Sequence, residues 1–387
     1  PAISNHSDGR WRVNDPELSL HESYGKRSEA LANGLMLINA PVDLFSIQAA
    51  SLKLALWGGH PGTSDKQVTV NGKGTYSIPE TGTEEHHCTY SYPEIPLEIS
   101  HLVNGVNAFQ YSCERGSTFW GHFIIDTAVL RFALKSDHAD LASYSLDSFQ
   151  AEISRQGRNG PLQEDEELSL NFTEIPSAAI DSVVYFGRYF GFDDNGNRLE
   201  SDWHGFTQNG RHINTLGTSA EAPYTVNWDT RMIPTQPSPM AVKAIIYFES
   251  GLRYETPTLN GLVFPDDRPD VMLYQCSEMP APFWSRANDK KVARMIINEN
   301  PQNVDKALLL VKVWDGGAGN IDQPFTLNGH AYNIISGEAI HDVVYTRIEV
   351  DVSHLRQGVN EFVLLSDTEH HGIEILLPGP CVIISRN

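Results

Sequence analysis

Leu52-Lys-Leu-Ala-Leu-Trp57-Gly-Gly59 returns later in the chain as Leu309-Leu-Val-Lys-Val-Trp314-Asp-Gly316. The turn sequence Val70-Asn71-Gly72 returns as Leu327-Asn328-Gly329, at the same distance from its tryptophan. The longest match pairs Ile99-Ser-His101-Leu-Val-Asn-Gly-Val-Asn107-Ala-Phe109 with Val352-Ser-His354-Leu-Arg-Gln-Gly-Val-Asn360-Glu-Phe362. The copies lie about 250 residues apart, far beyond the roughly 20 to 50 residues of a solenoid unit, so they indicate a duplicated domain.

The repeated stretch predicts strands and no long helix. Leu52, Leu54 and Leu56 alternate with other residues, which is the period of a half-buried strand. Asn71-Gly72 follows a strand-like run and readily adopts the positive φ angles of tight hairpin turns. Ser100-His101-Leu102 indicates one short helical or 3₁₀ turn before the next strand. Short strands separated by Gly, Asn and Pro predict an all-β fold in which each copy is a jelly roll or β-sandwich.

The duplication divides the chain into five segments. With 387 residues, the chain is long enough for two or three domains that each bury a core. We expect an N-terminal arm over 1–34, a β-sandwich over 35–135, an acidic linker over 136–167, a middle domain over 168–268 and a second β-sandwich over 269–387. About seven short strands fit within the middle domain, which predicts an immunoglobulin-like sandwich.

The net charge of the chain excludes some classes of binding partner. The chain has 28 basic and 49 acidic residues, a net charge of -21. This charge argues against nucleic acid, because neutralised phosphates supply most of that affinity, and against anionic membrane surfaces. No run of about 18 apolar residues occurs, so the sequence predicts no membrane insertion. The balance fits a soluble, extracellular protein or one that binds cations.

The cysteines and two sequons also indicate secretion. Two cysteines lie in each copy, Cys88 and Cys113 in the first and Cys276 and Cys381 in the second. One disulfide in each copy would fit an oxidising compartment, and four buried thiols are the alternative. The N-glycosylation pattern occurs at Asn5 and at Asn171. The start at Pro1 is consistent with a processed N-terminus, so we predict a secreted glycoprotein.

The repeat unit resembles the galactose-binding-like β-sandwich of carbohydrate-binding modules. The resemblance is carried by the strand ending in Trp57 or Trp314, by the Asn-Gly turn, and by the Ser-His-Leu…Gly-Val-Asn-x-Phe segment. It implies a sandwich that binds sugars with loops at one end, often beside a structural calcium ion, although some members bind no known ligand. The middle segment is similar to bacterial-type immunoglobulin-like domains through residues 222–230, a stretch that is structural in those domains.

Aromatic and polar side chains gather near the strand ends of each copy. Sugar recognition needs an aromatic ring against the C–H face of the sugar and planar polar groups for its hydroxyls. The candidate ligand-binding residues are Trp57, His60, Trp120 and His122 in the first copy and Trp314, Asp315, His370 and His371 in the second. A core position at a strand end is the alternative for Trp57 and Trp314. The second copy has His371 in the place of Trp120, so the copies would bind differently.

The candidate cation site lies in the middle domain. Asp193, Asn195, Asn197 and Asp202 place side-chain oxygens around Gly196, and calcium prefers such ligands. The loop lacks the last glutamate and the flanking helices of an EF-hand. A solvated hairpin loop rich in turn formers is the alternative. Calcium is the one cofactor that the sequence predicts.

The sequence contains no familiar catalytic motif. The Gly-x-Ser-x-Gly elbow, the His-Glu-x-x-His pair and the phosphate-binding loop are absent. His86-His87 and His370-His371 make poor metal chelates, because neighbours on a strand point to opposite faces. We therefore predict a non-catalytic protein that binds carbohydrate polymers or glycoprotein glycans, with two sandwiches suited to bivalent binding. The alternatives are a glycan-processing hydrolase or lyase with its site at an interdomain groove, and a structural or storage protein without a ligand.

Overall fold

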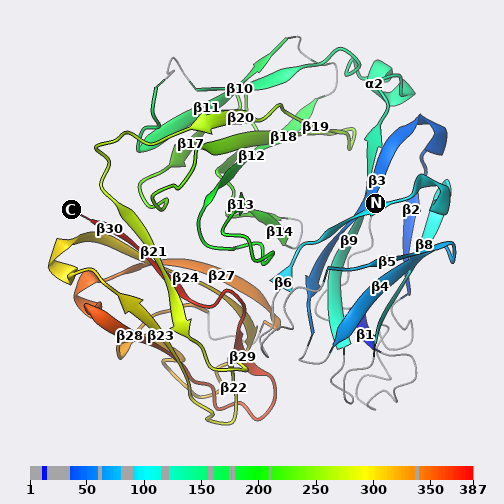
Figure 1. Ribbon diagram of the computed structural model, residues 1–387. Helices are drawn as coiled ribbons and strands as arrows, with labels where there is room; N and C mark the ends of the chain where they lie inside the picture. The colour runs from blue at the N-terminus through cyan, green and yellow to red at the C-terminus, as the bar shows by residue number, and fades with distance from the viewer. Residues whose placement is uncertain are drawn as a thin grey trace.

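The computed structural model describes residues 11–14, 35–59, 63–79, 90–114, 122–155, 160–173, 176, 179–208, 211–335 and 340–386. Within these residues the protein consists of antiparallel strands, one short α-helix, α2 (Ala139–Ser143), and a few 3₁₀ turns. The predicted all-β sandwich class is therefore confirmed. Figure 1 shows three groups of strands, coloured blue to cyan, green, and yellow to red along the chain. No described helix is long and apolar enough to cross a membrane.

The first sandwich packs two sheets around one core. One sheet has the order β1-β9-β3-β6, with β7 also paired to β3, and the other has the order β2-β8-β4-β5. Leu52, Leu54 and Leu56 of β3 all belong to the core, as their alternation predicts. The strands are β1 (Trp11–Asn14), β2 (Leu35–Ala40), β3 (Ile47–Trp57), β4 (Ser64–Val70), β5 (Gly74–Ser77), β6 (Tyr90–Ser91), β7 (Glu94–Leu97), β8 (Gly105–Glu114) and β9 (His122–Leu134).

The last sandwich repeats this architecture. Its strand β21 (Val271–Glu278) pairs with β30 in one sheet and with β23 in the other, so the two sheets form one path of hydrogen-bonded strands. Leu309, Val311 and Val313 of β24 face its core, like the three leucines of β3. The other strands are β22 (Trp284–Ser285), β23 (Lys291–Ile297), β24 (Val304–Gly316), β25 (Phe325–Leu327), β26 (His330–Ala331), β27 (Asp342–Val350), β28 (Gly358–Leu364), β29 (Gly372–Ile375) and β30 (Cys381–Arg386).

In the first copy, the repeated segments meet in a buried hydrogen-bond network. Asn71 Nδ2 donates to the carbonyl oxygen of His101 (2.9 Å) and to Oδ1 of Asn107 (2.8 Å). Asn107 also donates to the carbonyl oxygen of Val103 and accepts from its N–H, both at 2.9 Å. The hydroxyl of Tyr76 lies 2.6 Å from Nδ1 of His101. Three segments that are distant in sequence are thereby fixed against one another.

The second copy builds the same network from the equivalent residues. Asn328 Nδ2 donates to the carbonyl oxygen of His354 (2.8 Å) and to Oδ1 of Asn360 (2.7 Å). The hydroxyl of Tyr332 lies 2.7 Å from Nδ1 of His354. The predicted short turn is confirmed as 3₁₀ in both copies, η3 (Ile99–His101) and η5 (Val352–His354). The clearest part of the sequence repeat therefore stabilises the fold.

The middle unit is a sandwich of the immunoglobulin-like kind. One sheet has the order β10-β11-β17; the other has the order β13-β12-β18-β19, with β16 on β12 and β20 on β18. β10 and β11 thus form a sheet with the later strand β17, while β12 pairs with β18 and β18 with β19, which is the pairing pattern of immunoglobulin-like domains. The strands are β10 (Ala151–Arg155), β11 (Asp165–Phe172), β12 (Ile180–Phe190), β13 (Ser201–Trp203), β14 (Phe206–Gln208), β15 (Arg211–Ile213), β16 (Gly217–Ser219), β17 (Val226–Asp229), β18 (Met240–Phe248), β19 (Arg253–Glu255) and β20 (Leu259–Leu262).

Much of the stretch expected as an acidic linker belongs to this middle unit. Phe149, Ile153 and Leu162 are buried in its core, although they lie within residues 136–167. The acidic run that marked the linker is not wholly solvated, because Glu166 is buried and accepts from Nε of Arg155 at 2.9 Å. The acidic residues alone therefore predict the wrong start for the middle unit, because the carboxylate of Glu166 is paired inside the fold.

One buried lysine joins the three units. Lys312 of β24 donates from Nζ to the carbonyl oxygen of Tyr90 in the first sandwich (2.9 Å) and of Asp194 in the middle unit (3.0 Å). The rings of Tyr90, Tyr92 and Phe206 surround the ammonium, with the nearest centroid, that of Phe206, 4.8 Å from Nζ. Burial lowers the pKa of Lys312 to about 8. We call this region the junction.

Apolar contacts extend the junction on both sides. Trp57 and Tyr90 of the first sandwich share a cluster with Val343, Leu376 and Trp314 of the last sandwich. In a second cluster, side chains of the middle unit meet the outer face of the last sandwich: Phe192, Met232, Leu310, Cys381 and Ile383. The duplicated sandwiches therefore contact each other through the ends of equivalent strands, β3 and β24.

The predicted disulfide between Cys276 and Cys381 is not formed. Both residues are free thiols, while Cys88, the expected partner of Cys113, lies outside the described residues. Cys381 pairs in register with Gln275, so it shares a face with that residue, whereas Cys276 points to the opposite face of β21. Accordingly Cys276 packs on the core of the last sandwich and Cys381 on the middle unit. The alternative of buried thiols fits Cys381, whereas Cys276 is a thiol that is only half-buried.

Candidate functional site

Loops at one end of the last sandwich are tied together by hydrogen bonds. We call residues 286–290, 317–324, 332–335 and 365–371 the loop end; they adjoin the ends of β22, β24, β28 and β29. The N–H of Ala287 donates to the carbonyl oxygen of Thr368 (2.8 Å) and that of Leu365 donates to Pro324 (2.9 Å). These bonds between distant segments give the loop end a defined shape.

The loop end contains a pocket of about 470 Å³. Tyr332 supplies an aromatic ring, and Asp322, Gln323 and Asn333 supply exposed carboxylate and amide groups. The apolar part of the lining includes Ala318, Ile321, Pro324, Ile334 and Ile335. An aromatic ring with a few planar polar groups is the combination that sugar recognition requires. No periodic pattern in the sequence marks these residues, although the Asn328-Gly329 turn precedes Tyr332.

Three rings lie together beside the same end of the sandwich. The Trp314 ring centroid lies 5.9 Å from that of His371 and 6.0 Å from that of His341, and the two histidines are 4.7 Å apart. Trp284 Nε1 donates to the carbonyl oxygen of His371. His341 and His371 have φ angles of 53° and 71°, which are uncommon for residues other than glycine and concentrate at functional sites. Of these four residues, the sequence predicted Trp314 and His371.

The structure gives Asp315 and His370 different surroundings. Asp315 is buried, and its Oδ1 accepts from the N–H of Gly317 at 3.0 Å. Burial raises the pKa of Asp315, although that hydrogen bond opposes the rise. Asp315 therefore holds the start of the loop that follows β24. His370 is exposed on the loop before β29.

The predicted residues of the first copy are described only in part. Trp57 is 8% exposed and packs between the two sandwiches, as its core alternative predicts. His60 and Trp120 lie outside the described residues, and for His122 only the backbone, in β9, is described.

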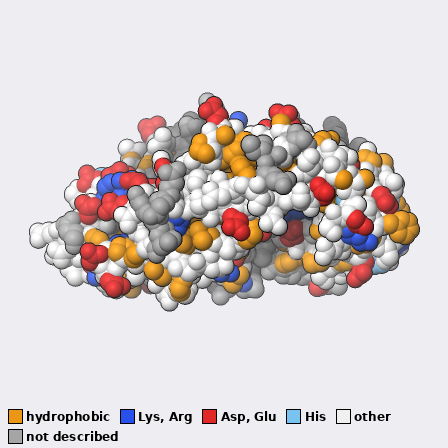
Figure 2. Space-filling view, turned by 90° about the horizontal axis from the view of Figure 1, so that it is seen from above, with side chains coloured by type: hydrophobic (Ala, Val, Ile, Leu, Met, Phe, Trp, Pro, Cys, Tyr) orange, Lys and Arg blue, Asp and Glu red, His pale blue; other side chains and the backbone are white. Residues whose placement is uncertain are grey.

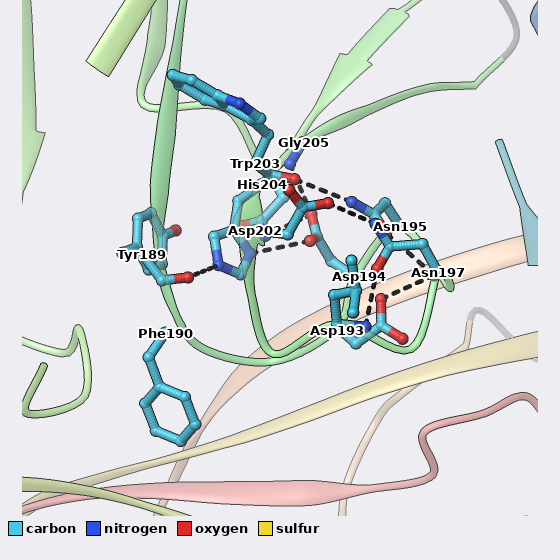
Figure 3. A network of polar contacts seen from close by, with 12 residues as sticks. Tyr189, Phe190, Asp193, Asp194, Asn195, Asn197, Asp202, Trp203, His204 and Gly205 are labelled. Atoms are coloured by element: carbon cyan, nitrogen blue, oxygen red, sulfur yellow. Dashed lines mark hydrogen bonds and ion pairs between the residues drawn. The ribbon is translucent and has the colours of Figure 1, made fainter. Parts of the chain in front are cut away.

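The loop predicted to bind calcium is organised by its own hydrogen bonds (Figure 3). Asp193 Oδ2 accepts from the N–H of Arg198 at 2.7 Å, and its Oδ1 accepts from the N–H of Asn197 at 3.1 Å. Asn195 Oδ1 accepts from the same N–H, while Asn197 Nδ2 donates to Asp202. Burial raises the pKa of Asp193, and these backbone N–H groups oppose the rise. The loop is thus neither solvated, as the alternative held, nor an open ring of free oxygens.

The neighbouring Asp194 is paired with a histidine inside the protein. Its Oδ1 lies 3.0 Å from Nδ1 of His204, and its Oδ2 accepts from the N–H of Gly205 at 2.9 Å. His204 Nε2 lies 2.8 Å from the carbonyl oxygen of Tyr189, so both ring nitrogens are engaged. Burial alone would lower the pKa of His204, but the hydrogen bond and charge of Asp194 raise it above its ordinary value.

The ammonium of Lys312 supplies positive charge beside this loop. It attracts Asp194 and Asp193 and hydrogen-bonds the Asp194 carbonyl oxygen. This ammonium would repel a second cation such as calcium. The oxygens of the loop already accept hydrogen bonds, so the loop suits these bonds better than it suits a calcium ion. Among the described residues no cluster of three or more His, Cys, Asp or Glu could hold a metal ion. Calcium binding stays a prediction, which melting curves with and without EDTA would test.

Buried titratable groups collect around Lys312. The hydroxyl of Tyr90 donates to Asp126, and both residues are buried. Burial raises the pKa of Tyr92 and of Tyr345 well above the usual range, with the charge of Asp194 acting in the same direction. One sequence signal pointed here: Lys312 interrupts an apolar strand at the position where the first copy has Ala55.

Comparisons with known proteins do not identify a family. No family model and no curated protein matches the chain. Among solved structures, the chain is similar to a β-porphyranase of glycoside hydrolase family 86 from the human gut bacterium Bacteroides plebeius, with 12% identity over 67% of this chain and 39% of that chain and a TM-score of 0.25. It is also similar to an α-L-rhamnosidase from Aspergillus terreus, with 13% identity over 62% of this chain and 27% of that chain and a TM-score of 0.19. The chain thus spans well under half the length of both enzymes, and likenesses this distant carry no argument about activity.

Proposed function

We propose that the protein binds carbohydrate at the loop end of its last sandwich. The observation that carries this proposal is the pocket in which Tyr332 stands beside the exposed groups of Asp322, Gln323 and Asn333. Each of these three side chains can accept hydrogen bonds from sugar hydroxyls, and the amides can also donate. The resemblance to galactose-binding-like sandwiches, which bind sugars with loops at one end, supports a site of this kind.

A glycan array tests this proposal with two matched variants. We expect the protein to bind at least one carbohydrate class, and the double substitution Asp322→Ala/Asn333→Ala to weaken that binding by roughly tenfold or more, because about 1 kcal/mol or more is lost for each polar contact. The control Asp305→Ala/Asn303→Ala changes the same residue types at exposed positions outside the loop end and should leave binding unchanged. Equal binding by the two double variants, or no binding to a broad array, would overturn the proposal.

A glycan-processing enzyme is the second candidate, and the junction favours it. Phenol and ammonium groups with shifted pKa values lie between domains there, which is typical of catalytic sites. Their burial argues for a structural role, since Asp126 is 6% and Lys312 0% exposed. Release of reducing ends from polysaccharides by the protein, lost in Asp126→Asn, would support catalysis over binding alone.

Secretion and N-glycosylation accompany the proposed function as predictions. Asn171 is exposed on β11, so its side chain is available to a glycan, whereas Asn5 lies outside the described residues. Expression in a eukaryotic secretory host followed by intact-mass analysis should show added glycan mass that is reduced by one glycan in Asn171→Gln.

A further inference from the structure

Positive side chains collect where the first sandwich faces the middle unit. Lys53 and Arg131 come from β3 and β9, and Lys243 and Arg253 come from β18 and β19. We call these four residues the cationic cluster. In a chain of net charge -21, such a group is unusual; on the face shown in Figure 2, acidic side chains are spread over the whole surface and accompany the few Lys and Arg side chains.

The cationic cluster is only partly neutralised. Arg131 pairs with Glu94 at 3.0 Å within the first sandwich, and Lys243 pairs with Glu255 at 3.1 Å within the middle unit. No ion pair joins Lys53 or Arg253 to a carboxylate in the described part of the chain. Two carboxylates against four cations leave a local excess of two positive charges.

Aromatic rings hold the cationic side chains of the middle unit in place. Lys243 Nζ lies 4.6 Å from the ring centroid of Trp203, and the Arg253 guanidinium lies 4.9 Å from that of Tyr247. His212 adds a ring 5.4 Å from Tyr247. Such cation–π contacts reduce the freedom of long side chains, so less entropy is lost when they bind a ligand.

Like charges face each other across the boundary between the two units. Burial lowers the pKa of Lys53 to about 8, and the charges of Arg131, Arg253 and Lys243 contribute to this. Burial and the charges of Lys53, Arg253 and Arg131 also lower the pKa of His212. Arg253 is exposed and Lys243 is 21% exposed, so solvent and ligands can reach the cluster. An anion between the units would turn this repulsion into attraction.

We propose that the cationic cluster binds a sulfate or carboxylate group of an acidic glycan between the first sandwich and the middle unit. A guanidinium group can donate paired hydrogen bonds to two oxygens of either oxyanion, and ammonium groups add charge. The glycan part of this inference rests on the proposed function; the anion part rests on the cluster alone. Because the rest of the chain repels polyanions, binding is confined to this boundary.

Calorimetric titration of the full chain with sulfated and unsulfated dextran oligosaccharides of equal length tests this inference. We expect the sulfated oligosaccharide to bind at least about tenfold more tightly, and Lys53→Gln/Arg253→Gln to remove that difference. The control Lys306→Gln/Arg356→Gln removes the same two charge types from exposed positions on the last sandwich and should retain the preference. Melting curves of all variants establish that each is folded.

The outcomes of this experiment distinguish the cationic cluster from the pocket at the loop end. If Asp322→Ala/Asn333→Ala keeps the preference for sulfate while Lys53→Gln/Arg253→Gln loses it, the inference stands, even where the array shows no pocket ligand. An unchanged preference in Lys53→Gln/Arg253→Gln, or no preference in the unsubstituted protein, overturns it. Equally tight binding of a single-stranded oligonucleotide of the same charge would also overturn it, since the cluster would then recognise any polyanion.

Discussion

Lys312 shows how a single buried charge can connect three units. Taking an ammonium group out of water is costly unless it is hydrogen-bonded and surrounded by compensating charge or ring faces. Here two backbone carbonyl oxygens from different units and three aromatic rings supply that compensation. The same geometry positions the first sandwich and the middle unit around one atom of the last sandwich.

This burial predicts a pH dependence that belongs to Lys312. Its pKa is about 8 in the folded protein and 10.5 when unperturbed, so the unfolded chain binds more protons between these values. Stability should therefore rise with pH through this window, and below about pH 8 the full cost of the buried charge is present. Between about pH 7.5 and pH 9.5, the unfolding free energy of the unsubstituted protein should rise by about 1 to 2 kcal/mol relative to Lys312→Met.

Urea unfolding at the two pH values measures this difference. Tyrosine ionisation is common to both proteins and cancels in the comparison. Lys306→Met, which removes an exposed lysine of the same strand, is the matched control and should behave like the unsubstituted protein. If the unfolding free energies of Lys312→Met and of the unsubstituted protein changed with pH in parallel, the claim that Lys312 is a buried ammonium with a lowered pKa would be contradicted.

At the scale of elements, the duplicated network fixes the turns of both sandwiches. Asn107 and Asn360 are each 0% exposed and make equivalent bonds to a neighbouring backbone and to the asparagine of the Asn-Gly turn. Replacing either by Ala leaves buried backbone groups without partners, so each substitution should cost about 2 to 3 kcal/mol. Urea unfolding of Asn107→Ala, Asn360→Ala and the exposed control Asn303→Ala measures this. Costs near zero, or in one copy only, would show that the networks are not equivalent.

The register of β21 and β30 makes a second prediction at this scale. Cys276 and Cys381 lie on opposite faces of one sheet, so they should remain thiols under oxidising conditions. Alkylation of the unfolded, unreduced chain followed by mass mapping should label both Cys276 and Cys381. A linked peptide containing Cys276 and Cys381 would contradict this register.

Sequence patterns predicted the strands and turns better than they predicted which residues these elements contact. Alternation placed Leu52, Leu54 and Leu56 in the core, and the Asn-Gly turns and 3₁₀ turns appeared where expected. The prediction of a disulfide between Cys276 and Cys381 failed because it rested on the number of cysteines per copy, which carries no information about strand register. Within the loop end the sequence indicated only His370 and His371, since Tyr332 and Asn333 follow no periodic pattern.

At the scale of the whole molecule, three sandwiches form one continuous assembly around the junction (Figure 1). The duplication predicted the two outer units, but the contacts between units use outward-facing residues such as Lys312 and Leu310, whose partners lie on other domains. The alternation of apolar and polar residues within one strand does not predict such contacts. The acidic linker was misplaced for a related reason, because Glu166 is paired inside the middle unit.

Hydrogen–deuterium exchange of the full chain, with and without the tightest-binding neutral carbohydrate from the array, tests the central claim most directly. A ligand in the pocket should slow exchange of backbone N–H groups in residues 317–324 and 332–335, where the lining residues lie. Segments 193–205 of the middle unit and 99–109 of the first sandwich should be unaffected. Protection confined to those segments, or absent throughout, would contradict a carbohydrate site at the loop end.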